Sequence, residues 1–236
     1  NFGNPENTKV MGEFAECLIG IKEACEFLEY PVVSGNVSFY NGTNKKNIDP
    51  TPVIGGVGLI QDTKNTINHI LKKEGNIILQ VGKTFGHLYQ SVFFKEIYSI
   101  TEGPPPDVNL ANEKHNGEIL LKLINKKLIT SAHDVSSGGL ILALAEMCFT
   151  SEYGLKIGKP QKLSNLMEYY FGEDQGRYLL EIEEKNLTVV AKILNEYNIF
   201  NESIATVQKD YFEMLGEFKI NKNDLCKMNN KWYNNY

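Results

Sequence analysis

The chain has 236 residues, of which 42% are hydrophobic and 22% charged. This length and balance fit one or two globular domains and exclude an intrinsically disordered chain. The longest uncharged apolar runs, residues 53–60 and 77–81, are far shorter than the ~20 residues that cross a bilayer. The polar start, residues 1–4, lacks the features of a secretory signal. The net charge of −5 gives no broad electrostatic reason to bind nucleic acid or an anionic membrane.

The four cysteines, Cys17, Cys25, Cys148 and Cys226, are widely spaced and form no Cys-x-x-Cys pair. This spacing argues against a zinc site and against a disulfide framework. Unpaired thiols are typical of a reducing compartment, so we expect a cytoplasmic protein.

The first elements make an incomplete unit. Apolar residues at helical spacing from Val10 to Leu28 predict an amphipathic helix of about 20 residues, which Pro31 ends. A strand at 32–40, a polar loop at 41–49 and a second strand at 53–60 are expected to follow. So few elements bury too little apolar surface to fold alone, which indicates the last part of a larger domain.

Residues 61–74 are polar and basic and are the best linker candidate. Beyond them, helical and strand patterns alternate over about 150 residues, which predicts a layered α/β (α+β) domain with a sizeable core. The expected strands are 76–81, 129–133, 155–157, 177–183, 204–208 and 212–218, and the expected helices are 88–100, 110–127, 140–150, 163–170 and 187–197. The Asn- and Lys-rich end, residues 221–236, is expected to form a short helix or a frayed tail.

The stretch His133-Asp134-Val135-Ser136-Ser137-Gly138-Gly139-Leu140 is the most informative motif. It places a carboxylate at the end of a strand, beside a glycine turn that opens a helix. Such a turn can offer backbone amides to an anion while the carboxylate holds the accompanying Mg²⁺. The alternative is that Asp134 caps the helix and the glycines only pack.

Two further turns carry polar side chains. Gly82-Lys83-Thr84-Phe85-Gly86-His87 contains Gly-Lys-Thr, but position 77 is Ile where a P-loop requires Gly, so only a weaker anion contact through Lys83 and Thr84 stays open. Residues 171–177, Phe-Gly-Glu-Asp-Gln-Gly-Arg, could form a ligand site, although a buried ion pair that fixes the loop is the commoner outcome. The four isolated histidines favour surface or capping roles.

Four ordered motifs together resemble one family over about residues 1–218. They are Asn1-Phe2-Gly3-Asn4-Pro5-Glu6, residues 32–41, residues 51–58, and the Asp134 turn. These stretches are similar to the C-terminal part of the large (synthetase) subunit of phosphoribosylformylglycinamidine synthase, of the small bacterial type. That family belongs to the aminoimidazole ribonucleotide synthetase-like superfamily. The resemblance implies a subunit with two pseudo-repeated halves, each with an N-type and a C-type α/β domain.

The resemblance implies a domain plan and an activity. Residues 1–62 would be the end of the second N-type domain, 63–74 a linker, 75–220 the second C-type domain and 221–236 a tail. The family uses ATP and Mg²⁺ to convert formylglycinamide ribonucleotide and ammonia to the amidine in purine biosynthesis, with a glutaminase subunit and a small accessory subunit as partners. The catalytic histidine is expected outside this chain, so the fragment alone should be inactive.

The same resemblance implies binding residues. Asp134 matches the family's acidic metal ligand, and Ser137 stands where the family usually has a second Asp. Asn1, Asn4 and Asn36 fall in motifs that line the nucleotide cleft of the second half, and Gly138 and Gly139 belong to the glycine turn, so these five are candidate nucleotide-binding residues. The alternatives are another member of the ATP-binding superfamily, or a non-catalytic scaffold module.

Overall fold

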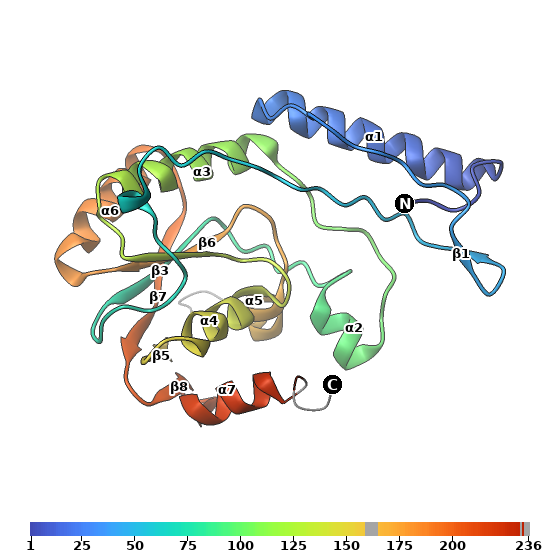
Figure 1. The fold of residues 1–236 in the computed structure, drawn as a ribbon. Helices are drawn as coiled ribbons and strands as arrows, with labels where there is room; N and C mark the ends of the chain where they lie inside the picture. Colours follow the sequence, from blue (N-terminus) through green and yellow to red (C-terminus); the bar gives the residue numbers. More distant parts are fainter. Residues whose placement is uncertain (159–164, 232, 234–236) are drawn as a thin grey trace. The chain divides into compact units, whose positions relative to one another are not determined.

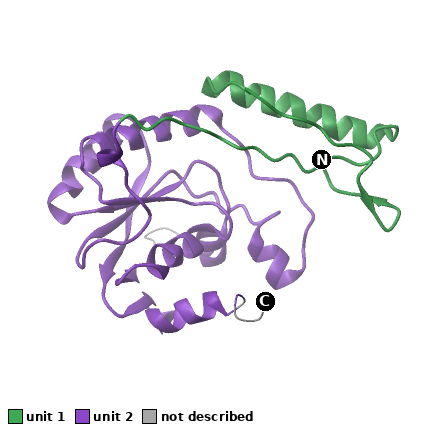
Figure 2. Ribbon diagram, viewed as in Figure 1, with its two compact units in different colours: residues 1–61 green, residues 62–236 purple. Residues whose placement is uncertain are grey.

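The structure is a computed structural model that describes residues 1–158, 165–231 and 233. The chain divides into two compact units, residues 1–61 and residues 62–236 (Figure 2). Within the part of the chain described, no helix is both long enough and apolar enough to span a membrane.

Unit 1 is built on one long helix, α1 (Thr8–Leu28), as the sequence predicts. The side chain of Asn7 caps its start by accepting from the Lys9 amide, and Glu29 ends it in the left-handed conformation. A short hairpin follows within the expected polar loop, and its strands, β1 (Gly42–Thr43) and β2 (Lys46–Asn47), have two residues each. The ring of Phe14, on this helix, packs against the rings of Phe2 and Phe39.

The prediction of two strands in this unit, at 32–40 and 53–60, is wrong. Neither segment is a strand, and their side chains are largely exposed, with Val33 at 93% and Val57 at 91%. An apolar, β-branched run becomes a strand only when its backbone pairs with a neighbour. The first of these segments instead makes isolated backbone bonds to the start of the chain: Phe2 donates to the Ser38 carbonyl and Tyr40 donates to the Gly3 carbonyl.

Unit 2 contains a seven-stranded sheet in the order β4-β6-β3-β7-β5-β8-β9 (Figure 1). All neighbours are antiparallel except β5 and β8, which are parallel. The strands are β3 (Ile77–Val81), β4 (Ser131–Asp134), β5 (Gly154–Ile157), β6 (Tyr178–Ile182), β7 (Asn201–Gln208), β8 (Tyr211–Met214) and β9 (Phe218–Asn221). The strand expected at 212–218 is therefore two strands, because a turn with Gly216 at φ 80° reverses the chain.

The described helices of unit 2 largely follow the expected pattern. They are η1 (Thr63–Asn65), α2 (Val92–Tyr98), α3 (Leu110–Asn125), α4 (Gly139–Phe149), α5 (Leu166–Phe171), α6 (Glu184–Glu196) and α7 (Lys222–Asn230). The helix predicted from residue 88 begins only after Ser91, whose hydroxyl accepts from the Phe94 amide. The start of the helix expected at 163–170 lies outside the described residues.

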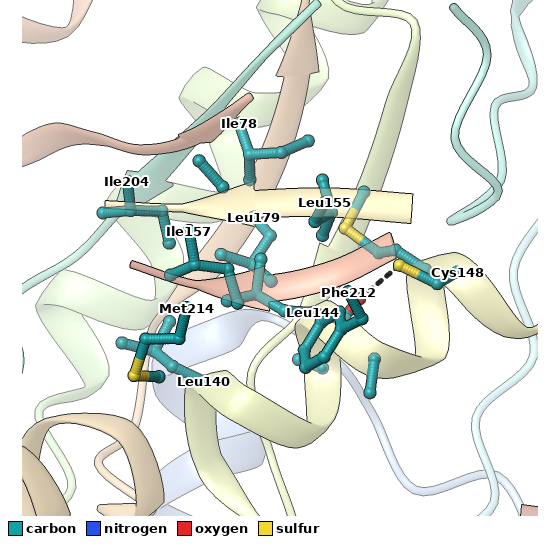
Figure 3. Packing of buried hydrophobic residues seen from close by; sticks show 14 of the residues in the cluster. Ile78, Leu140, Leu144, Cys148, Leu155, Ile157, Leu179, Ile204, Phe212 and Met214 are labelled. Atoms are coloured by element: carbon teal, nitrogen blue, oxygen red, sulfur yellow. Dashed lines mark hydrogen bonds between the residues drawn. The ribbon is translucent and has the colours of Figure 1, made fainter. Parts of the chain in front are cut away.

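Helices cover both faces of the sheet, and the strand alternation assigns the core residues (Figure 1). Ile78 and Leu179 face one cluster, which α4, α5 and α7 cover, whereas Leu79 and Leu180 face a second cluster, which α3 and α6 cover. Figure 3 shows α4 side chains packed against β5 and β8 in the first cluster. Unit 2 is therefore a three-layer α/β structure, which agrees with the fold class that the sequence predicts.

A buried carboxylate fastens the start of unit 2 to this sheet. Glu181 on β6 is fully buried and accepts from the backbone amides of Lys72 and Lys73, from the Asn76 side chain and from the Ser131 hydroxyl. These donors satisfy the charge, which would otherwise be costly to bury. Residues 71–76 are consequently held along the sheet.

Candidate functional site

The strand register brings three of the motifs to one end of the sheet. Tyr178, the first residue of β6, lies opposite both Val81 at the end of β3 and Asp134 at the end of β4. Because β6 is antiparallel to both neighbours, its entering loop meets their departing turns. The turn at 82–87, the turn at 134–139 and the loop at 172–177 therefore lie together, and we call this group the turn junction.

A carboxylate of the chain itself accepts hydrogen bonds from the backbone amides of the 82–87 turn. Asp174 Oδ2 accepts from the amides of Phe85 and Gly86, both at 2.9 Å, and Oδ1 accepts from His87 at 3.2 Å. A glycine turn after a strand does bind an anion here, but the anion belongs to the chain itself. Lys83 and Thr84 thus do not frame an open phosphate cradle, since the neighbouring amides are engaged.

Arg177 completes the buried part of the turn junction. Its guanidinium is fully enclosed and donates to the Thr84 hydroxyl at 3.1 Å and to the carbonyls of Asp174 and Gly172. Burial lowers the Arg177 pKa, against the opposing effect of the nearby Asp174 carboxylate. The interpretation of residues 171–177 as a loop fixed by a buried ion pair is confirmed.

Glu173 holds the second turn. One oxygen, Oε1, accepts from the Gly138 amide at 2.8 Å and from the Val92 amide at 2.7 Å. Gly138 and Gly139 both have positive φ, 83° and 70°. A Cβ on Gly139 would approach the Gly172 and Tyr170 carbonyl oxygens to 2.7 Å, so glycine is required for this close approach.

Asp134, the predicted metal ligand, is the last residue of β4. The alternative that it caps the following helix is wrong, because the N-cap of α4 is Gly138 and, in the part of the chain that the structure describes, no side-chain hydrogen bond caps that helix. The Asp134 carboxylate is 65% exposed and lies 3.3 Å from His133 Nδ1, while His133 Nε2 lies 3.1 Å from Glu146. Among the described residues no group of three or more His, Cys, Asp or Glu could enclose a metal ion. A single exposed carboxylate still fits Mg²⁺, because Mg²⁺ in nucleotide sites takes one or two carboxylates and fills its shell with phosphate oxygens and water.

The predicted nucleotide-binding residues fall in both units. Asn1, Asn4 and Asn36 belong to unit 1. The Asn1 amino group donates to the Thr51 carbonyl, the Asn4 side chain accepts from the Glu6 amide, and Asn36 is exposed. Gly138 and Gly139 lie in the turn junction, where their amides donate to Glu173 and to the Ser136 carbonyl. Their nucleotide contacts stay predictions.

A pocket of about 600 Å³ lies beside the turn junction, within unit 2. Its lining includes Phe85, His87 and the carboxylates of Asp107, Glu113 and Glu168. Burial raises the pKa of the Glu113 carboxyl above its ordinary value, while a hydrogen bond with the Gly176 backbone acts the other way. Among the described residues, the lining of the pocket contains acidic side chains and no Lys or Arg.

Sequence reasoning singled out the loop at 171–177 without assigning Glu173 a role of its own, and it missed Glu113. The signal for Glu173 was its place beside Asp174 in a loop with two glycines, but nothing local shows that its acceptor atoms reach residues 35 and 81 positions away. Glu113 lies on α3 among polar residues, and it becomes partly buried because the loop at 172–177 packs against it through the Gly176 backbone.

The comparisons with known proteins define the class of the chain. The model of the AIR synthase related protein, C-terminal domain, matches residues 73–214, and that of the AIR synthase related protein, N-terminal domain, matches residues 1–60. The first of these alone covers more than half of the sequence. The chain belongs to the AIR synthase related protein family.

Two curated relatives are similar to this chain along its whole length. The chain is 51% identical over 236 residues to the phosphoribosylformylglycinamidine synthase subunit PurL of Pelagibacter ubique, and 43% identical over 237 residues to that of Bradyrhizobium diazoefficiens. Each alignment covers the whole chain but 32% of the relative, so the chain spans about a third of the length of these proteins.

Solved structures agree on the fold. PurL from Thermotoga maritima complexed with FGAR matches 70% of this chain and 30% of its own length, with a TM-score of 0.61 and 16% identity. The same protein complexed with ATP matches 70% of this chain and 28% of its own, with a TM-score of 0.56 and 14% identity. At this identity the likeness shows a common fold.

Proposed function

We propose that this chain is the C-terminal part of the synthetase subunit of a phosphoribosylformylglycinamidine synthase. The complete polypeptide would be an ATP-dependent ligase that converts formylglycinamide ribonucleotide and ammonia to the amidine in purine biosynthesis. The observation that carries the proposal is the 51% identity, maintained along all 236 residues, to a subunit with that name. The domain plan inferred from the sequence, with 1–62 and 75–220 as parts of N-type and C-type domains, belongs to the same proposal.

Within this function, the part of unit 2 described here supplies a wall of a nucleotide site. Asp134 would contribute one carboxylate to Mg²⁺, which when bound neutralises phosphate charge. The internal bonds of the turn junction hold this carboxylate at the end of β4 and keep the adjacent glycine turn in its left-handed conformation. The catalytic residues of the ligase are proposed to lie in the rest of the longer polypeptide.

The proposal extends to cofactors, partners and location. ATP and Mg²⁺ are the proposed cofactors, and Asn1, Asn4 and Asn36 with Gly138 and Gly139 remain the candidate nucleotide contacts. One solved structure that matches this chain bears the name PurLQS from Thermotoga maritima, and the resemblance of the sequence implies subunit partners. A glutaminase subunit and a small accessory subunit are therefore the proposed partners here, and the cytoplasm is the proposed compartment.

Activity assays of two polypeptides test the function. The complete synthetase polypeptide, given ATP, Mg²⁺, formylglycinamide ribonucleotide and ammonium chloride, should form the amidine with release of phosphate. The isolated 236-residue chain should form none above background. Absence of amidine with the complete polypeptide would contradict the proposed reaction, and formation by the isolated chain would contradict the placement of the catalytic groups elsewhere.

A matched pair of variants tests the metal site. In the complete polypeptide, Asp134→Asn should weaken Mg·ATP binding about tenfold, because one carboxylate is lost from a hard-cation site. Asp210→Asn, which changes an exposed Asp in the turn between β7 and β8, should leave binding unchanged. If Asp134 binds no metal ion, both variants should bind Mg·ATP like the wild type.

A further inference from the structure

Glu173 joins two parts of unit 2 that are far apart in sequence. Its Oε1 accepts from Val92, the first residue of α2, and from Gly138, the residue before α4. Its own amide donates to the His87 carbonyl at 2.9 Å, which fixes the backbone from which the side chain extends. A single carboxylate oxygen is thus the link between the start of α2 and the turn that follows β4.

The Asp134 turn is held at both ends by the same loop. At its start, the Val135 amide donates to the Arg177 carbonyl at 3.0 Å, which continues the pairing of β4 with β6. At its end, the Gly138 amide donates to Glu173 at 2.8 Å. The first bond is made by backbone atoms alone, whereas the second depends on the Glu173 carboxylate.

We propose that Glu173 is a positioning residue for the Asp134 turn: by fixing the Gly138 end, it determines the orientation of the Asp134 carboxylate toward its Mg·nucleotide. The proposal rests on the proposed function for the identity of that ligand. Oε1 of Glu173 is engaged by two backbone amides, so the role proposed for it is to hold the turn. A carboxylate suits this role because hydrogen bonds to an ionised acceptor are stronger than neutral ones.

Amide hydrogen exchange of the 236-residue chain tests the structural link without any ligand. In Glu173→Ala, exchange at Gly138 and Val92 should become roughly tenfold to hundredfold faster, since both amides lose a charged acceptor. Ser91→Ala is the matched control, because it removes the other side-chain bond at the start of α2, to Phe94, and leaves Gly138 untouched. Unchanged exchange at Gly138 in Glu173→Ala would overturn the proposal.

Binding of Mg·ATP to the complete synthetase polypeptide tests the consequence. Glu173→Ala should weaken binding about tenfold, and Glu173→Gln, which retains an acceptor oxygen, should restore it to within about threefold of wild type. Ser91→Ala should bind like wild type even where its melting temperature falls. A merely structural Glu173 would instead lower the melting temperature and leave the dissociation constant unchanged, which overturns the proposal.

The same binding series separates this proposal from the proposed function. If Asp134→Asn weakens binding while Glu173→Ala does not, the metal site stands and the positioning role is refuted. If Asp134→Asn binds like wild type, the metal-site assignment fails and the positioning role fails with it. Weakening in both variants, with Gln rescue at position 173, supports both.

Discussion

Replacing Asp174 with Asn should destabilise the chain by about 3 kcal/mol. The carboxylate is buried, with its side chain 5% exposed, and accepts three backbone amides from the 82–87 turn. An asparagine keeps one acceptor oxygen and turns an NH₂ group toward the remaining donor, so at least one buried amide loses its partner, at about 1–3 kcal/mol. The bonds that remain become neutral, and the buried Arg177 loses its nearest carboxylate.

Urea unfolding followed by circular dichroism measures this loss. The midpoint should fall with little change in slope, and the melting temperature should drop by roughly 6–12 °C. Asp210→Asn, which removes the same charge from an exposed turn, should change stability by less than ~0.5 kcal/mol. A loss below ~1 kcal/mol for Asp174→Asn would refute the conclusion that this carboxylate holds the 82–87 turn.

Three other properties follow from burial and pairing. Burial raises the pKa of Glu113 above its ordinary value of 4.5, so the stability that its neutral form contributes is complete below that value and is lost as the pH rises through the raised pKa. Glu113→Gln should therefore gain stability relative to wild type when urea unfolding is measured at pH 7 instead of pH 4. A difference in stability that does not change with pH would contradict this. Burial raises the pKa of the Cys148 thiol to about 12. Iodoacetamide at pH 8 should therefore alkylate the half-buried Cys17 well before Cys148. Equal labelling of the two thiols, measured by mass spectrometry, would be inconsistent with the packed core. Residues 31–60 form no sheet ladder apart from the short hairpin, so their amide hydrogens should exchange earlier than those of residues 129–150. Equal protection of the two segments would argue against the exposed conformation of residues 31–60.

The sequence by itself determined the elements whose signals are local. The apolar periodicity predicted α1, α3 and α4 to within a few residues, because side-chain spacing acts over one or two helical turns. The glycines at 138 and 139 and the acid at 134 were identifiable as one turn for the same reason. The strand predictions succeeded where the chain supplies sheet neighbours, as for β3 and β6.

Only the tertiary structure decided which groups meet and which donors are already engaged. The same apolar pattern gives a strand at 77–81, which pairs on both sides, and an unpaired segment at 53–60, because a ladder needs a neighbour that local sequence does not specify. The glycine turn at 82–87 looks open to an anion in sequence, yet the antiparallel placement of β6 delivers Asp174 to its amides. Strand order determines these hydrogen bonds, whose partners lie 35 to 89 residues apart, so composition and spacing could not reveal them.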